Sequence, residues 1–231
     1  MTNHLLAVEK PARYTGGETG AISGAGAEVS FVLAFPDVYE VGMSHLGLQV
    51  LYGVLKQYDW LAPERVYAPW PDREEQLRGD HLSLTTLESG RILRELDIVG
   101  FTLQYELSYT NILTMMELGE IPLLASSRDE RFPLIIGGGP CAYNPEPLAD
   151  FFDLFLLGDG EEAILEIAAV VREAKKNVLS RRELLVKLSA IQGVYVPSLF
   201  EPRYDDAGRL VEIVPLLPGY DTVKRRFVTN L

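Results

Sequence analysis

Four short segments of the sequence carry glycines, polar or acidic side chains, or both, as loops that bind a ligand often do. They are Asp37-Val38-Tyr39-Glu40-Val41-Gly42, Thr102-Leu103-Gln104, Gly137-Gly138-Gly139 and Gly158-Asp159-Gly160-Glu161. Glycine lets a ligand or another backbone approach closely, and carboxylate, hydroxyl and amide groups supply hydrogen bonds. The candidate cofactor-binding residues are therefore Asp37, Tyr39, Gly42, Thr102, Gln104, Gly137, Gly138, Gly139, Asp159, Gly160 and Glu161.

Each segment also has a structural interpretation. Asp37 and Ser44 could cap a helix with Gly42 in the turn, and acidic residues at 159–161 could stabilise the first turn of a helix. Three adjacent glycines at 137–139 are entropically costly for a turn alone. They do not form a G-x-G-x-x-G pattern after a first strand, which disfavours a nicotinamide dinucleotide site.

The segments follow apolar runs that predict strands buried on both faces, as in parallel sheets. Predicted strands cover residues 29–35, 65–68, 97–103, 132–136 and 152–157, and predicted helices cover 44–57, 90–96, 109–118 and 162–175. This alternation indicates an α/β fold with a doubly wound, five-stranded parallel sheet of Rossmann-like type. Ligands bind such sheets outside the carboxyl ends of the strands, where the strand order reverses. We therefore expect the four segments to converge around one hollow.

Glycine content and the pattern of apolar residues divide the chain into three parts. Residues 1–28 are rich in glycine and are expected to form an N-terminal arm, and residues 29–176 form the Rossmann-like domain. Residues 177–231 are expected to form a C-terminal extension that leads as a linker toward a further domain. Within that extension we predict a helix at 180–190, a strand at 193–198 and part of a hairpin at 207–214.

Composition excludes several classes of protein and site. The net charge of −12 argues against a nucleic-acid-binding surface, which needs clustered Lys and Arg. One cysteine, Cys141, excludes an intramolecular disulfide and a self-contained cysteine-ligated cluster. The three histidines, His4, His45 and His81, lack metal-ligand spacing, and His45 is expected to be an ordinary helix residue. No secretory signal and no membrane-spanning apolar run occurs, so we expect a cytoplasmic protein without a membrane partner.

On these segments the chain resembles a cobalamin (B12)-binding Rossmann domain. More narrowly, it resembles the N-terminal segment of an uncharacterised family of radical S-adenosylmethionine (SAM) proteins. The resemblance covers essentially the whole chain and rests on Arg13–Glu18, Phe35–Tyr52, Glu64–Trp70, Val99–Asn111, Ile135–Phe151, Gly158–Glu162 and Gly193–Ser198.

The resemblance implies a cobalamin site with one departure from the usual pattern. Cobalamin domains of this fold typically carry D-x-H-x-x-G, S-x-L and Gly-Gly motifs, and Tyr39 stands in place of the histidine that binds cobalt. A phenol is neutral at pH 7 and a poor substitute ligand. The implied cobalamin therefore has no protein nitrogen on cobalt and a buried nucleotide tail. Gly137–Gly139 would admit the tail, Thr102 and Gln104 would line its channel, and Asp37 and Tyr39 would lie beneath the corrin.

The resemblance also implies a partner. The [4Fe–4S] cluster and SAM belong to a following radical SAM core domain, in the same parent chain or a separate one, because its three-cysteine motif is absent here. The implied reaction is radical methyl transfer, or a related reaction, on an unknown substrate. The alternative is a cofactor-free docking or substrate-interaction module in which Tyr39 and Glu40 fill the corrin space. A flavodoxin-like FMN site is disfavoured because no Ser/Thr-rich loop follows the first strand.

Overall fold

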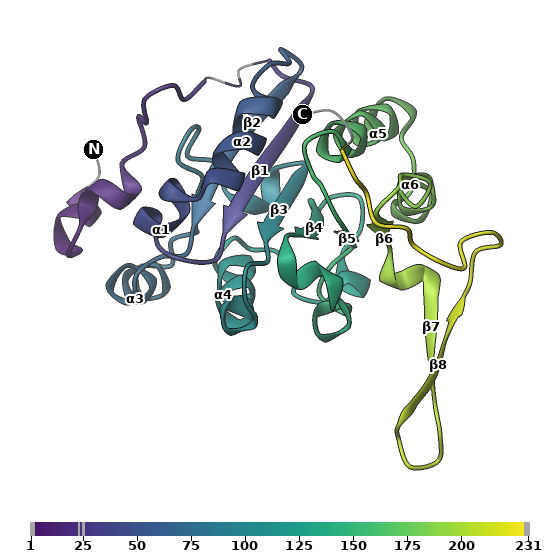
Figure 1. Ribbon diagram of the computed structural model, residues 1–231. Coiled ribbons are helices and arrows are strands. Elements are labelled where there is room, and N and C mark those ends of the chain that lie inside the picture. The colour runs from purple at the N-terminus through teal and green to yellow at the C-terminus, as the bar shows by residue number, and fades with distance from the viewer. Residues whose placement is uncertain (1–2, 23, 25, 229–231) are drawn as a thin grey trace.

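A six-stranded sheet forms the centre of the protein in a computed structural model that describes residues 3–22, 24 and 26–228 (Figure 1). Its strand order is β2-β1-β3-β4-β5-β6. The strands are β1 (Val29–Phe35), β2 (Leu61–Tyr67), β3 (Ile98–Thr102), β4 (Leu134–Gly138), β5 (Leu154–Leu156) and β6 (Val194–Tyr195). The first five are parallel and β6 is antiparallel to β5. The predicted Rossmann-like α/β fold is therefore confirmed, with one added antiparallel strand.

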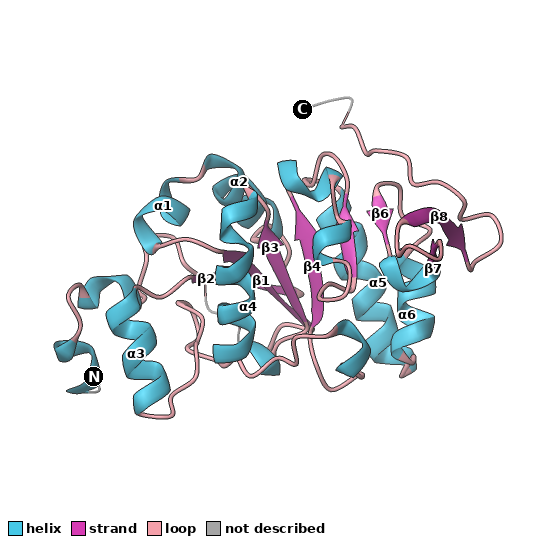
Figure 2. Cartoon of the chain, turned by 90° about the horizontal axis from the view of Figure 1, so that it is seen from below, coloured by secondary structure: helices cyan, strands magenta, loops and turns pink. Residues whose placement is uncertain are grey.

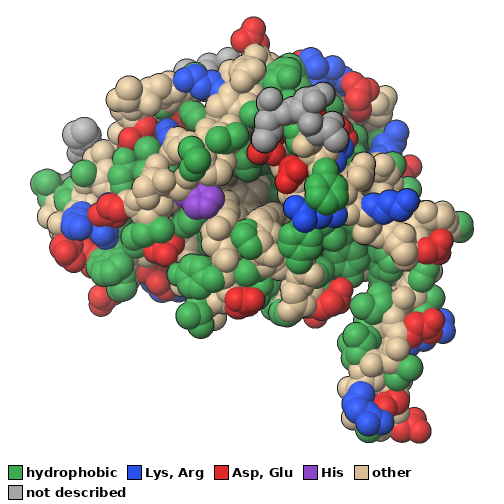
Figure 3. All heavy atoms as spheres, viewed as in Figure 1, with side chains coloured by type: hydrophobic (Ala, Val, Ile, Leu, Met, Phe, Trp, Pro, Cys, Tyr) green, Lys and Arg blue, Asp and Glu red, His purple; other side chains and the backbone are tan. Residues whose placement is uncertain are grey.

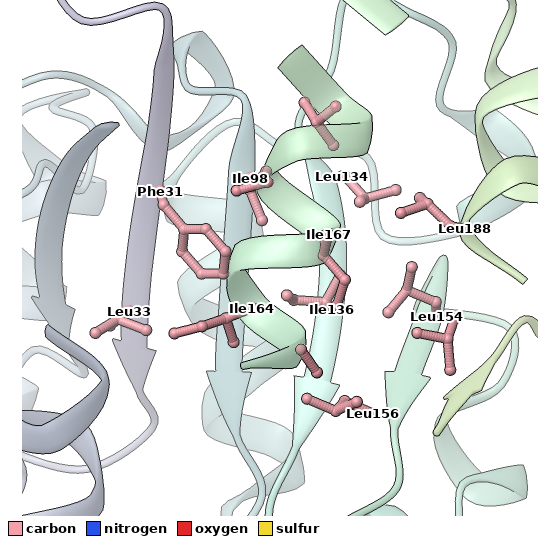
Figure 4. Packing of buried hydrophobic residues seen from close by; sticks show 14 of the residues in the cluster. Phe31, Leu33, Ile98, Leu134, Ile136, Leu154, Leu156, Ile164, Ile167 and Leu188 are labelled. Carbon is pink, nitrogen blue, oxygen red and sulfur yellow. The ribbon is translucent and has the colours of Figure 1, made fainter. Parts of the chain in front are cut away.

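Helices cover both faces of the sheet (Figure 2). On one face lie α1 (Tyr39–Ser44), α2 (Leu46–Leu55), α5 (Ala163–Asn177) and α6 (Arg181–Leu188). On the other lie α3 (Pro71–Gly79) and α4 (Tyr109–Leu118). Figure 4 shows Ile164 and Ile167 of α5 directed at Phe31, Ile98 and Ile136 of the sheet. Every residue of β1 is buried, as its continuous apolar run predicts for a central parallel strand.

The predicted helix at 44–57 is wrong in one respect, because the chain forms two helices that meet at His45. His45 has an extended backbone (φ −76°, ψ 110°), and its Nδ1 accepts a hydrogen bond of 3.1 Å from the Leu48 N–H. Ser44 ends α1 instead, and its hydroxyl donates to the carbonyl of Val41. The helix cap is therefore His45 and not Ser44, since only the histidine lies at the turn with a free acceptor.

Several other elements differ from the sequence prediction. Strand β2 begins at Leu61, because the buried Glu64 is satisfied by the hydroxyls of Thr86 and Ser89 and so tolerates a strand interior. The predicted helix at 90–96 is a single 3₁₀ turn at Leu93–Glu95. Helix α3 carries few apolar residues and was not predicted.

The C-terminal part adds a projecting hairpin and then returns to the sheet. Strands β7 (Phe200–Tyr204) and β8 (Leu210–Pro215) form the hairpin, which extends away from the body (Figure 1). The predicted strand at 193–198 is shorter, with only β6 in the sheet. The Arg226 N–H then donates to the Leu157 carbonyl at 2.8 Å, and the Asp159 N–H donates to the Arg226 carbonyl at 3.2 Å.

The N-terminal segment contains two 3₁₀ turns, Asn3–Ala7 and Pro11–Tyr14, and packs along α1 and α3. The segment is held there by a salt bridge in which Arg13 Nε lies 2.9 Å from Glu40 Oε2. Among the described residues, no helix is both long enough and apolar enough to cross a membrane.

Candidate functional site

A cavity of about 280 Å³ lies at the carboxyl ends of β1, β3, β4 and β5, beneath α2 and α5. Figure 3 shows the surface hollowed there, with a histidine side chain at its rim. The described residues lining it are Phe31, Leu33, His45, Gly47, Leu48, Leu51, Gly100, Phe101, Thr102, Gln104, Ile136, Gly137, Gly138, Gly139, Leu156, Gly158, Asp159, Gly160, Glu161 and Ile164. The volume is close to the lower end of the range for small-molecule and cofactor sites, roughly 300–1,000 Å³.

Small residues on two neighbouring strands create the hollow. Thr102 of β3 is paired in register with Gly138 of β4, and Gly100 lies two residues earlier on the same face as Thr102. Large residues such as Phe31 and Ile136 surround this patch on the same face. The helices above cannot fill the missing volume from Leu48, Leu51 and Ile164 alone, so a depression is left open.

The three consecutive glycines have different physical roles. A Cβ at Gly137 would lie 2.9 Å from both Leu103 and Phe155, so this glycine allows tight packing on the opposite face. Gly139 has φ +112°, and a Cβ there would lie 2.9 Å from the Leu103 carbonyl oxygen. At Gly138 a Cβ would meet no atom within 4 Å. Packing and backbone conformation therefore explain Gly137 and Gly139, whereas Gly138 borders open space.

The loop after β5 is held from outside the cavity. The Asp159 carboxylate accepts a hydrogen bond of 2.9 Å from the Val228 N–H, and Gly158, with φ +112°, lies against the Arg226 backbone. The Arg226 side chain pairs with Glu162, which directly precedes α5, and with Glu166 within that helix. No side chain of this acidic loop caps α5 through a hydrogen bond. The C-terminal segment thus fixes the loop that carries Asp159, Gly160 and Glu161.

Asp37, Tyr39 and Gly42 lie outside the cavity, although they follow β1. Asp37 accepts from the Val38 N–H at 2.7 Å and from the Tyr105 hydroxyl at 3.3 Å. Tyr39 packs edge-on against Tyr67 with ring centroids 5.5 Å apart, and burial together with Glu18 raises its pKa to about 12. A Cβ on Gly42 would lie 2.2 Å from the Tyr67 ring, so the backbone there must be close to that ring.

His45 and Gly47 are among the lining residues that were not candidates from the sequence. The ring of His45 lies so close to Gly47 that a Cβ on this glycine would be 3.0 Å from its Cε1. A single helix over 44–57 would have placed His45 on a regular helical turn. The available signal was Ser-His-Leu-Gly, in which a side chain able to cap precedes a glycine that leaves room for the ring.

The lining is mainly apolar with an uneven distribution of polar groups. Asp159 and Glu161 contribute carboxylates on the β5 side, and Thr102 and Gln104 contribute neutral polar groups. No Lys or Arg is among the described residues of the lining. Cys141 lies in the 3₁₀ turn after Gly139, and burial raises the pKa of its thiol. Within the described ranges, no three His, Cys, Asp or Glu side chains gather as a metal site.

Comparison with known proteins identifies a family for this arrangement. The family model described as "Radical SAM proteins, N-terminal" matches residues 47–197. An uncharacterized protein of Methanocaldococcus jannaschii is 24% identical over 142 residues, which are 61% of this chain and 26% of that protein. The chain thus spans about a quarter of the length of the curated relative that it matches. No solved structure matches the chain.

Proposed function

The chain belongs to the family of N-terminal domains of radical SAM proteins, and we propose that it binds cobalamin, with the nucleotide tail in the cavity beneath α2 and α5. Eight of the predicted site residues line that cavity: Thr102, Gln104, Gly137, Gly138, Gly139, Asp159, Gly160 and Glu161. They come from the carboxyl ends of β3 and β4 and from the loops after β3, β4 and β5, at the edge where open α/β sheets bind ligands. The ligand-binding unit in this proposal is the Rossmann-like domain at residues 29–176.

The observation that carries the proposal is the open space at Gly138. A Cβ at this position would meet no protein atom within 4 Å, and Gly138 lines the cavity. Packing therefore does not account for the glycine, whereas a flat heteroaromatic base lying against the sheet does. Phe31, Leu33 and Leu156 offer that base an apolar surface, and the Thr102 hydroxyl and the Gln104 amide offer it hydrogen bonds.

The chain's own contribution would be positioning and exclusion of water from the tail. Tyr39 lies outside the cavity and is packed on Tyr67, so it does not supply a cobalt ligand from within this site. When bound, cobalamin would act as the carrier of a methyl group. The radical chemistry would be carried out by a partner core domain that holds a [4Fe–4S] cluster and SAM.

A cofactor-free interaction module is the second candidate. The rim carries Asp159 and Glu161 and no lining Lys or Arg, an unfavourable field for the phosphate of a nucleotide tail. Tyr39 and Glu40, which this candidate places in the corrin space, do not line the cavity proposed for the tail: Tyr39 packs on Tyr67, and Glu40 is bound by Arg13. The hollow is left open for a ligand.

The test is a titration of the purified chain with hydroxocobalamin and methylcobalamin, followed by desalting and a visible spectrum. The proposal predicts retained colour and a spectrum of cobalamin with its tail base displaced from cobalt. Loss of all colour on desalting would favour the cofactor-free module.

A further inference from the structure

From the geometry around His45, we infer that this residue is a positioning residue that donates a hydrogen bond from Nε2 to an acceptor on the ligand in the cavity. This inference rests on the proposed function and names one contact in it. The acceptor is expected to be an anionic oxygen of the nucleotide tail, such as its phosphate. The argument starts from the proton on the imidazole ring.

The helix fixes the tautomer of His45. Its Nδ1 accepts the Leu48 N–H at 3.1 Å, so in the neutral ring Nδ1 is unprotonated and the proton is on Nε2. A nitrogen that carries a proton has no lone pair for cobalt. The neutral ring therefore offers the ligand a hydrogen-bond donor and not a metal ligand.

The imidazole ring of His45 is held in place by its neighbours, while its Nε2 makes no hydrogen bond to a described residue. It lies against Gly47, where a Cβ would approach Cε1 to 3.0 Å, and its centroid is 5.1 Å from that of Phe35. The side chain is half-buried and lines the cavity, and no described residue accepts a hydrogen bond from Nε2. Two neighbours thus fix the imidazole while its remaining polar atom stays available.

The charges around the cavity determine which ligand group this donor would take. Asp159 and Glu161 on the β5 side can only accept hydrogen bonds when ionised, so they suit ribose hydroxyls or amide N–H groups. His45 on the α2 side is the lining residue able to favour an anion, since no Lys or Arg lines the cavity. The ligand's anionic group is therefore expected to lie at α2, away from the carboxylates.

The test separates the hydrogen bond from the helix cap. In His45→Asn the side-chain oxygen can still cap α2, because asparagine is among the best capping residues, but the side chain is too short to replace the Nε2 donor. Binding of cobalamin and of cobinamide, which lacks the nucleotide tail, is measured for both proteins by equilibrium dialysis. We expect His45→Asn to weaken cobalamin binding by about 10- to 100-fold, the loss typical of a hydrogen bond to a charged group, and to leave cobinamide binding unchanged.

Equal cobalamin affinity in the two proteins, or an equal loss for both corrinoids, would overturn the role of His45. If the unsubstituted protein bound neither corrinoid, the proposed function would fail and this role would fail with it. A second measurement does not depend on the variant. Long-range ¹H–¹⁵N spectra of the unsubstituted chain should show the Nε2–H tautomer of His45, with a shift on adding cobalamin but not cobinamide. A proton on Nδ1 would contradict the inference.

Discussion

The two ends of the central sheet are built in opposite ways. At the amino end, Asp97 and Asp153 precede β3 and β5 and bind backbone and cationic groups. Asp97 accepts from the Ser30 N–H at 2.8 Å and pairs with Lys175, while Asp153 accepts from the Ile135 N–H at 2.7 Å. At the carboxyl end, glycine-rich loops surround a cavity whose described lining contains no Lys or Arg.

The two ends of the sheet therefore have different roles, one in stabilising the strands and the other in leaving space for a ligand. A depression at one end removes packing contacts, so the strands there depend on constraints imposed elsewhere. The buried carboxylate of Asp153 joins Arg128 at 3.2 Å and Arg181 at 2.6 Å, tying β5 to α6 and to the loop before β4. The amino end therefore fixes the spacing of the strands, and the carboxyl end is free to accommodate a ligand.

The largest expected effect comes from breaking the amino end. Asp153→Ala would leave two arginines without their shared partner, one of them fully buried, and should lower the free energy of unfolding by about 3–5 kcal/mol. Urea unfolding followed by circular dichroism measures this. The control is Arg131→Ala, which removes an exposed pair with Asp129 and should cost at most about 1 kcal/mol. Similar losses in the two variants would show that the Asp153 cluster does not fix the sheet.

A smaller effect should separate two adjacent glycines. Gly137→Ala forces a Cβ against Leu103 and Phe155 and should cost about 1–3 kcal/mol. Gly138→Ala meets nothing within 4 Å and should be neutral or slightly stabilising, since alanine reduces the entropy of the unfolded chain. Thermal unfolding of both variants checks the contrast. A destabilised Gly138→Ala would mean that the cavity is closed in solution.

The smallest effect concerns the arm beside α1. The hydrogen bond from Arg13 lowers the pKa of the Glu40 carboxyl to about 2, below its ordinary value of 4.5, and a backbone hydrogen bond and Lys10 add to this effect. Because the folded-state pKa is depressed, this contribution to stability is fully present above about pH 4.5 and is lost as the pH falls toward about 2. Trp70, which the Arg13 guanidinium overlies at 5.0 Å, should report the change by fluorescence. In Glu40→Gln, the same titration should be flat. If the Trp70 fluorescence of the unsubstituted protein were also flat over this pH range, the Arg13–Glu40 pair would not be the source of a pH-dependent stability.

Much of this arrangement follows from sequence patterns. The apolar runs identified all five parallel strands, and strand-end chemistry identified the loops after β3, β4 and β5 as neighbours. The apolar spacing of residues 44–57 did not identify His45, because its role depends on a break between α1 and α2 that this spacing does not reveal. Tyr39 was expected near the ligand, yet its ring turns to Tyr67 on β2, a contact set by tertiary packing. The different roles of Gly137 and Gly138 also depend on which sheet face each residue occupies.

The central claim is that the space at Gly138 holds a cobalamin tail. Its most direct test is equilibrium dialysis of hydroxocobalamin against the unsubstituted chain and Gly138→Leu, with thermal unfolding to verify that both are folded. The account predicts binding by the unsubstituted chain and none by Gly138→Leu, because the leucine side chain would extend from an unobstructed Cβ position into the cavity. Equal binding by a folded Gly138→Leu would contradict the assigned site, and no binding by either protein would contradict the proposed cofactor.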